Sequence, residues 1–117
     1  MNAVIAAPMA SKSLARELWI SLASLLRSHV EMRALAQPAT GLRIVSTSDT
    51  HVELESRSCK LQLTAPGVSG SGNIDFCSPE KSTLFFFTED GLVHFKKPDA
   101  TMEMEAAVEY LLDTVCA

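Results

Sequence analysis

A phenylalanine-rich stretch, residues 83–97, constrains the fold of this chain most, because it holds four of the five phenylalanines. At its centre, residues 88–91 are Thr-Glu-Asp-Gly, which suits a type I turn followed by a glycine in the left-handed conformation. This connection is common in β-hairpins and fixes their register, so the stretch predicts a hairpin with defined cross-strand neighbours. The predicted pairs are Phe85 with Phe95 and Phe87 with Val93 on one face, and Leu84 with Lys96, Phe86 with His94 and Thr88 with Leu92 on the other.

The second face of this hairpin carries more apolar surface than a single core needs. The face with Phe85 and Phe95 is enough to build a core, so the other face must be covered by something else. A histidine on that face could act as a general base or a pH switch, but the sequence places no carboxylate to orient it. A histidine at the edge of an interface, or one whose hydrogen bonds are satisfied by backbone, is the simpler interpretation. The residues of this second face are Leu84, Phe86, Leu92 and His94.

Two amphipathic helices are predicted at the ends of the chain. From Ser11 or Ser13 to Ala36 no glycine or proline intervenes, and apolar residues recur at steps of three and four until Pro38 ends the pattern. About 25 helical residues would span about 37 Å, whereas typical strands span about 17–20 Å, so part of this helix should overhang the sheet. Ile20 is isolated among its polar residues. A second helix is expected after Pro98, capped by Asp99 or Thr101.

Short segments of alternating polarity lie between the helices. Residues 41–47, 51–55, 59–64 and 73–77 are expected to form short strands before the hairpin, and their short connections favour an antiparallel meander. Their apolar residues fall on one face, which predicts that both helices pack on that face. The expected fold is α+β, with a long N-terminal helix, an antiparallel meander of five to six short strands and a C-terminal helix. The length predicts one domain, residues 11–117, preceded by a flexible tail, residues 1–10.

Composition excludes some classes of partner. The net charge of −4 and the pI near 5.3 argue against sequence-independent binding of nucleic acid, and no apolar run is long enough to span a membrane. A local basic patch is conceivable, but scattered solvated charges are the simpler interpretation; its candidates are Arg27, Arg33, Arg43, Lys96 and Lys97. The three cysteines form no CxxC motif, and their odd number predicts free thiols in a reducing compartment, hence a cytoplasmic protein. They are Cys59, Cys77 and Cys116.

No motif for catalysis, metal binding or cofactor binding stands out. His51, Glu53 and Glu55 share one strand face, but the Pro-Cys-x-x-Cys segment of zinc deaminases is missing, so a solvated face is the simpler interpretation. The glycines of residues 67–72 lack the spacing of a phosphate-binding loop or a nucleophile elbow, and we interpret this segment as a hairpin connection. No cofactor and no metal is therefore expected.

The leading hypothesis is a small non-enzymatic binding or interaction domain that forms a homodimer. Its interface would use the exposed apolar surface of the hairpin and the first helix, that is Leu84, Phe86, Leu92, His94 and Ile20. One alternative is a small-molecule-binding domain or enzyme with a Phe-lined pocket between sheet and helices, with His94, Cys77 or Tyr110 as polar contacts. Another alternative is a secretion-type chaperone or adaptor that pairs a partner's strand with a sheet edge.

Overall fold

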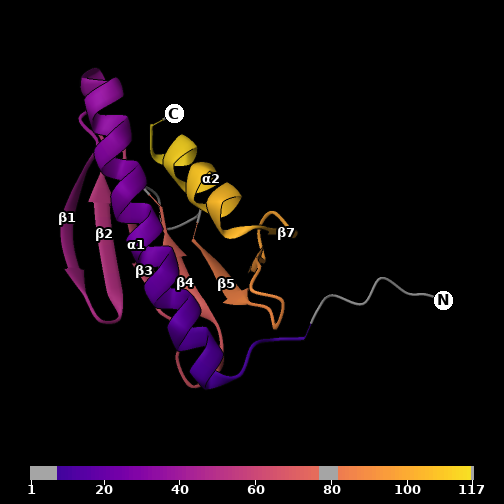
Figure 1. The fold of residues 1–117 in the computed structure, drawn as a ribbon. Coiled ribbons are helices and arrows are strands. Elements are labelled where there is room, and N and C mark those ends of the chain that lie inside the picture. Colours follow the sequence, from indigo (N-terminus) through magenta and orange to yellow (C-terminus); the bar gives the residue numbers. More distant parts are fainter. Residues whose placement is uncertain (1–7, 77–81, 117) are drawn as a thin grey trace.

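The computed structural model describes residues 8–76 and 82–116, and they form a seven-stranded antiparallel sheet with one helix at each end of the chain (Figure 1). The strands are hydrogen-bonded in chain order, β1 to β7, so the sheet is a simple meander. The helices are α1 (Lys12–Ala36) and α2 (Met104–Cys116), and a short 3₁₀ turn, η1 (Pro38–Thr40), follows α1. The strands are β1 (Arg43–Ser48), β2 (His51–Glu55), β3 (Lys60–Thr64), β4 (Gly72–Asp75), β5 (Thr83–Phe87), β6 (Val93–Phe95) and β7 (Ala100–Met102).

The predicted α+β meander with two flanking helices is confirmed, with one strand more than expected. The additional strand is β7, which pairs with β6 so that Thr101 lies opposite His94. The prediction that Asp99 or Thr101 caps the last helix is wrong, because Thr101 belongs to β7 and Asp99 lies in the turn that precedes this strand. The helix begins instead at Met104, and the carbonyl of Glu103 accepts a hydrogen bond from the Ala107 amide at 2.9 Å.

The predicted register of the phenylalanine-rich hairpin is confirmed at each pair. Phe85 lies opposite Phe95, and Phe86 lies opposite His94. The Lys96 amide donates to the Leu84 carbonyl at 3.0 Å, and the turn closes with Gly91 at φ 82°. A positive φ of this kind favours glycine, which has no Cβ to clash. The turn sequence therefore determined the alignment of both strands, as its chemistry predicted.

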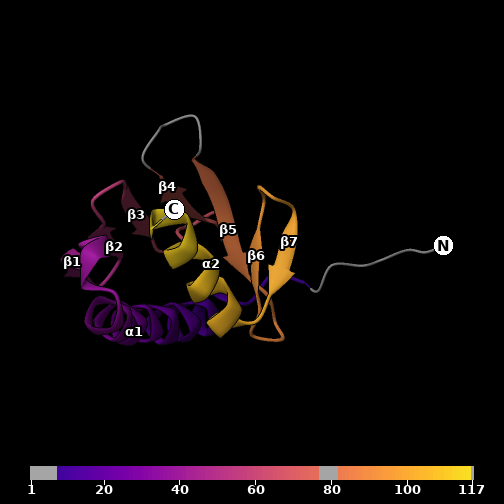
Figure 2. The same cartoon turned by 90° about the horizontal axis from the view of Figure 1, so that it is seen from above.

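Both helices pack on the same face of the sheet. In Figure 2 the strands form an arc, and α1 and α2 lie on its inner side. Trp19 of α1 stacks on Phe85 with ring centroids 6.5 Å apart, and Phe85 meets Phe87 edge to face at 5.6 Å. Each fully buried side chain of this size stabilises the fold by about 1.5–3 kcal/mol. The core continues along the inner faces of the strands and the facing sides of the helices, with Leu22, Leu26, Val52, Leu54, Leu61, Leu63, Ile74, Val108, Leu111 and Leu112.

The start of α1 is tied to the hairpin turn. Ser11 caps the helix by accepting a hydrogen bond from the Leu14 amide at 3.3 Å. Immediately before it, the Ala10 amide donates to the Phe87 carbonyl at 2.9 Å, and the Glu89 amide donates to the Pro8 carbonyl at 2.9 Å. Residues 8–10 of the segment predicted as a tail are thus held against the end of β5, while residues 1–7 lie outside the described part of the chain.

An ion-pair cluster joins the second half of α1 to α2. Glu109 on α2 accepts from Nδ1 of His29 at 2.8 Å and from Arg33, and Arg33 also pairs with Asp113 at 2.9 Å. Burial alone would lower the pKa of Arg33, but hydrogen bonds to Asp113 and Cys116 and the nearby carboxylates raise it above its ordinary value. Arg33 therefore stays charged between the two helices. Beyond this cluster the end of α1 extends past the strands (Figure 1).

Replacing Arg33 by methionine is expected to lower the free energy of unfolding by about 1–2 kcal/mol, because Glu109 and Asp113 lose their shared cation. The side chain of Arg33 is only 19% exposed, so its interactions are partly shielded from water. Arg43 offers a matched control, since its side chain is 65% exposed and makes an ion pair to Glu55 at 3.3 Å. Urea denaturation of R33M and R43M measures both effects, and equal losses in the two variants would contradict this role of Arg33.

Gly72 is required where β4 passes beneath an aromatic ring. A Cβ at this position would lie 2.4 Å from the Thr64 carbonyl oxygen and 2.5 Å from Cε1 of Phe85. Phe85 is also its partner in the sheet, so the ring covers the glycine backbone directly. Neither neighbour can move easily, because Phe85 is fixed in the core and Thr64 contributes backbone.

The G72A variant is expected to lose about 1–3 kcal/mol of unfolding free energy through overpacking. G67A is the control, because a Cβ at Gly67 meets nothing within 4 Å, and it should change stability by less than about 0.5 kcal/mol. Thermal or urea unfolding of both proteins makes the comparison. Wild-type stability of G72A would show that the sheet adjusts around the added methyl group.

Candidate functional site

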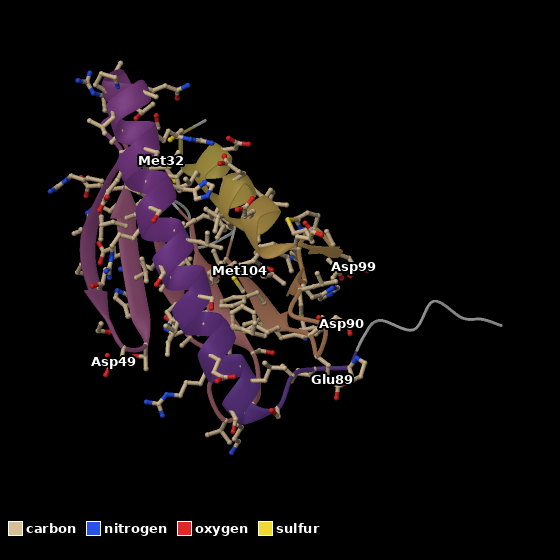
Figure 3. All side chains as sticks on the ribbon, in the orientation of Figure 1. Met32, Asp49, Glu89, Asp90, Asp99 and Met104 are labelled. Carbon is tan, nitrogen blue, oxygen red and sulfur yellow. The ribbon has the colours of Figure 1, made fainter. Side chains whose placement is uncertain are left out.

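A groove of about 750 Å³ lies between the first half of α1 and two loops at the same end of the molecule. One loop is the turn between β1 and β2, in which Figure 3 labels Asp49, and the other connects β3 to β4. The helix lines the groove over four turns, from Lys12 to Arg27. The site is therefore assembled from three parts of the chain that are distant in sequence.

Trp19 fixes the floor of the groove. Its side chain is 4% exposed, and its Nε1 donates a hydrogen bond to the Asp49 backbone carbonyl at 2.9 Å. The two loops are in turn joined to each other, because the Ala65 amide donates to the Thr50 carbonyl at 2.8 Å. Gly70 adopts φ 85°, and the side chain of Met9 packs directly over it. The walls of the groove are thus held in place by hydrogen bonds and packing.

Two aliphatic side chains in the groove are open to solvent. Ile20 is 57% exposed and Val68 is 92% exposed, and both line the groove from opposite sides. Isolated exposed aliphatic residues are ordinary on a protein surface, but two of them in one concavity make an apolar surface that a ligand could cover. Ala15, Ala23 and Pro66 extend this surface.

The rim of the groove is basic although the chain as a whole is acidic. Lys12, Arg16 and Arg27 line it, and in residues 8–76 and 82–116 none of these three cations forms an ion pair. Among the lining residues that the structure describes, Asp49 is the one acidic side chain. Of the residues proposed for a basic patch, Arg27 is the one in the groove, whereas Arg33 and Arg43 are paired with carboxylates elsewhere.

The predicted interface residues lie on two sides of the molecule. Ile20 is on the helical layer, in the groove. Leu84 and Phe86 alternate with Phe85, which stacks on Trp19, so they face the outer side of the sheet. The structure therefore brings Phe86 and His94 together, with ring centroids 4.8 Å apart, but does not bring either near Ile20. Leu84 is 38% exposed; Phe86 and Leu92 are partly buried.

His94 is held by two neighbours that the sequence did not place beside it. Nδ1 lies 2.7 Å from Oγ1 of Thr101, and Nε2 lies 3.2 Å from Oδ1 of Asp99. The sequence alone placed no carboxylate beside this histidine, but β7 and its preceding turn bring Asp99 back to β6. Both ring nitrogens contact a polar partner, and the side chain is only 15% exposed. His94 therefore connects β6 to β7 and to the turn between them.

The remaining candidates from the sequence are dispersed. His51 Nε2 lies 3.8 Å from Oε1 of Glu53, while Glu55 pairs with Arg43. In the part of the chain that the structure describes, no three His, Cys, Asp or Glu side chains converge as a metal site would require. Phe85, Phe87 and Phe95 on the inner face of the hairpin are 1% exposed and fill the core.

The prediction of free thiols is wrong for one cysteine. Cys59 takes part in a disulfide bond, whereas Cys116 is a free thiol and Cys77 lies outside the described residues. An odd number of cysteines means that they cannot all form disulfide bonds, but three cysteines still allow one disulfide bond. Because disulfides are typical of oxidising compartments, the cysteines no longer argue for a cytoplasmic protein.

No family model, curated protein or solved structure matches this chain. Neither helix in residues 8–76 and 82–116 combines the length and apolar character needed to cross a membrane. The sequence did not predict the groove, because its lining comes from a helix and two loops that are distant in the chain. Ile20, isolated among polar residues, was the signal in the sequence that pointed to this surface.

Proposed function

We propose that this protein is a small non-enzymatic binding domain, and that the groove along the first half of α1 receives a segment of a partner protein. The observation that carries the proposal is the pair of solvent-exposed aliphatic side chains, Ile20 and Val68, in a concavity of about 750 Å³. This volume falls within the range of about 300–1,000 Å³ that is typical of ligand sites.

The composition of the groove supports binding rather than catalysis. Its described lining residues include hydroxyl groups from Ser24, Ser48 and Thr50 but neither histidine nor cysteine. A hydroxyl nucleophile needs an adjacent general base, and in the described part of the chain these three side chains form no hydrogen bond to one. The groove therefore offers contact surface and charge, without an activated nucleophile.

The shape of the groove supports a peptide as its ligand. From Lys12 to Arg27 the helix rises about 22 Å, which is the length of six or seven extended residues at about 3.3 Å each. The floor is preorganised by the hydrogen bond from Trp19 to the Asp49 carbonyl. A preformed groove reduces the entropy that is lost when a ligand orders its own binding site.

The I20D variant is expected to lower the affinity for groove-binding peptides at least about tenfold. Covering an isoleucine side chain contributes about 1.5–3 kcal/mol, and about 1.4 kcal/mol corresponds to a factor of ten. A random peptide library is displayed and selected on the wild-type protein, and the affinities of selected peptides are measured by fluorescence anisotropy.

The matched control for this test is M32D. Met32 is 66% exposed on the same helix but lies away from the groove, near the opposite end from Asp49 (Figure 3). M32D should bind the selected peptides as the wild-type protein does. If no selected peptide distinguishes I20D from the wild-type protein, the groove is not the binding site.

A second candidate function is self-association through the outer face of the hairpin. Leu84 is 38% exposed beside Phe86, and neither residue packs against the hydrophobic core. These side chains supply an apolar centre on a face whose other strands carry polar residues. A second copy of the chain could cover this centre in a two-fold interface, in which the same patch meets itself.

If the hairpin face is a dimer interface, L84D should convert a dimer into a monomer. Light scattering at high micromolar concentration should then give twice the chain mass of 12.7 kDa for the wild-type protein and the single mass for L84D. V45D is the matched control, because Val45 on β1 is 39% exposed. A wild-type protein that is monomeric at this concentration rules the dimer out.

A further inference from the structure

We infer that the groove is selective for an acidic peptide segment in which carboxylates flank an apolar residue. This inference rests on the proposed function and adds the chemistry of the ligand. Lys12, Arg16 and Arg27 line the groove, and in residues 8–76 and 82–116 all three are without ion-pair partners. Arg33 and Arg43 pair with carboxylates, whereas Arg57, Lys60, Lys96 and Lys97 also form no ion pair among the described residues but do not line the groove.

The spacing of the charged and apolar side chains along α1 predicts how charged and apolar residues are spaced in the ligand. Arg16, Ile20 and Arg27 are separated by four and seven residues, which places them on one flank of a helix. Ile20 lies about 6 Å along the axis from Arg16 and about 10 Å from Arg27. A complementary ligand carries an apolar side chain between two carboxylates that are about 16 Å apart. In an extended peptide this distance corresponds to a separation of about five residues.

The distribution of charge favours a short acidic peptide over nucleic acid. The three cations and Asp49 give the lining residues a net charge of +2. Because the whole chain has a net charge of −4, the residues outside the groove carry a net charge of −6. Glu17 and Glu31 are exposed on α1 but do not line the groove. A long polyanion would extend beyond the groove and meet this negative surface, whereas a short peptide would contact the positive region alone.

The test compares two double variants with the same net charge. R16E/R27E reverses two cations of the groove, and K96E/K97E reverses two exposed cations in the turn between β6 and β7. Both lower the net charge from −4 to −8. Peptides selected from the displayed random library are measured on the wild-type protein and both variants by fluorescence anisotropy. The wild-type measurements are repeated at about 0.05 M and 0.5 M salt.

We expect the selected peptides to be acidic around an apolar residue, and R16E/R27E to weaken their binding about tenfold or more. K96E/K97E should retain wild-type affinity within about twofold, and high salt should weaken binding to the wild-type protein. The salt series uses unaltered protein, so it tests the inference even if a variant folds poorly.

Two results would overturn the inference. If both double variants weaken peptide binding equally, the loss of affinity comes from the net charge of the chain and not from the cations of the groove. Peptides that are sensitive to I20D but are not acidic, and that bind R16E/R27E normally, would leave the proposed function in place and remove its acidic selectivity. Absence of any peptide sensitive to I20D would instead remove the proposed function itself.

Discussion

The arrangement of this protein depends on the contacts of Trp19. One face of its indole packs on Phe85 in the core, while Nε1 holds the turn between β1 and β2 through the Asp49 carbonyl. A single side chain therefore links α1 to the centre of the sheet and to the loop at its end. Because a buried indole N–H without a partner is costly, the hydrogen bond and the stacking reinforce each other. The small exposed part of the Trp19 side chain lines the groove.

The two faces of the phenylalanine-rich hairpin have different surroundings. The inner face is closed by both helices, and Phe85, Phe87 and Phe95 are almost completely buried. The outer face is only partly covered, and β7 supplies that cover by bringing Asp99 and Thr101 to His94. Other parts of the same chain thus cover His94 and part of Phe86. Leu84 is the large apolar side chain of this face that stays exposed. This surface is smaller than the sequence indicated.

Local chemistry was enough to predict the hairpin register and the first helix, because a Thr-Glu-Asp-Gly turn and an uninterrupted apolar periodicity each act within a few residues. Features that depend on distant partners were missed. β7 has only three residues, too few for their alternation to stand out in the sequence, and the role of Gly72 depends on the Phe85 ring across the sheet. The groove combines a helix with two loops, so the cations of α1 could be seen in the sequence, but the loops that lie opposite them could not.

The position of the single tryptophan has a spectroscopic consequence. Indole emission shifts to the red when the ring meets water, and Trp19 is 4% exposed while its Nε1 is bonded to the turn between β1 and β2. Local detachment of this turn would change the emission while the helices, and hence the far-ultraviolet circular dichroism, remain intact. Unfolding followed by both signals therefore separates loosening of the groove from loss of the whole fold, without any added label.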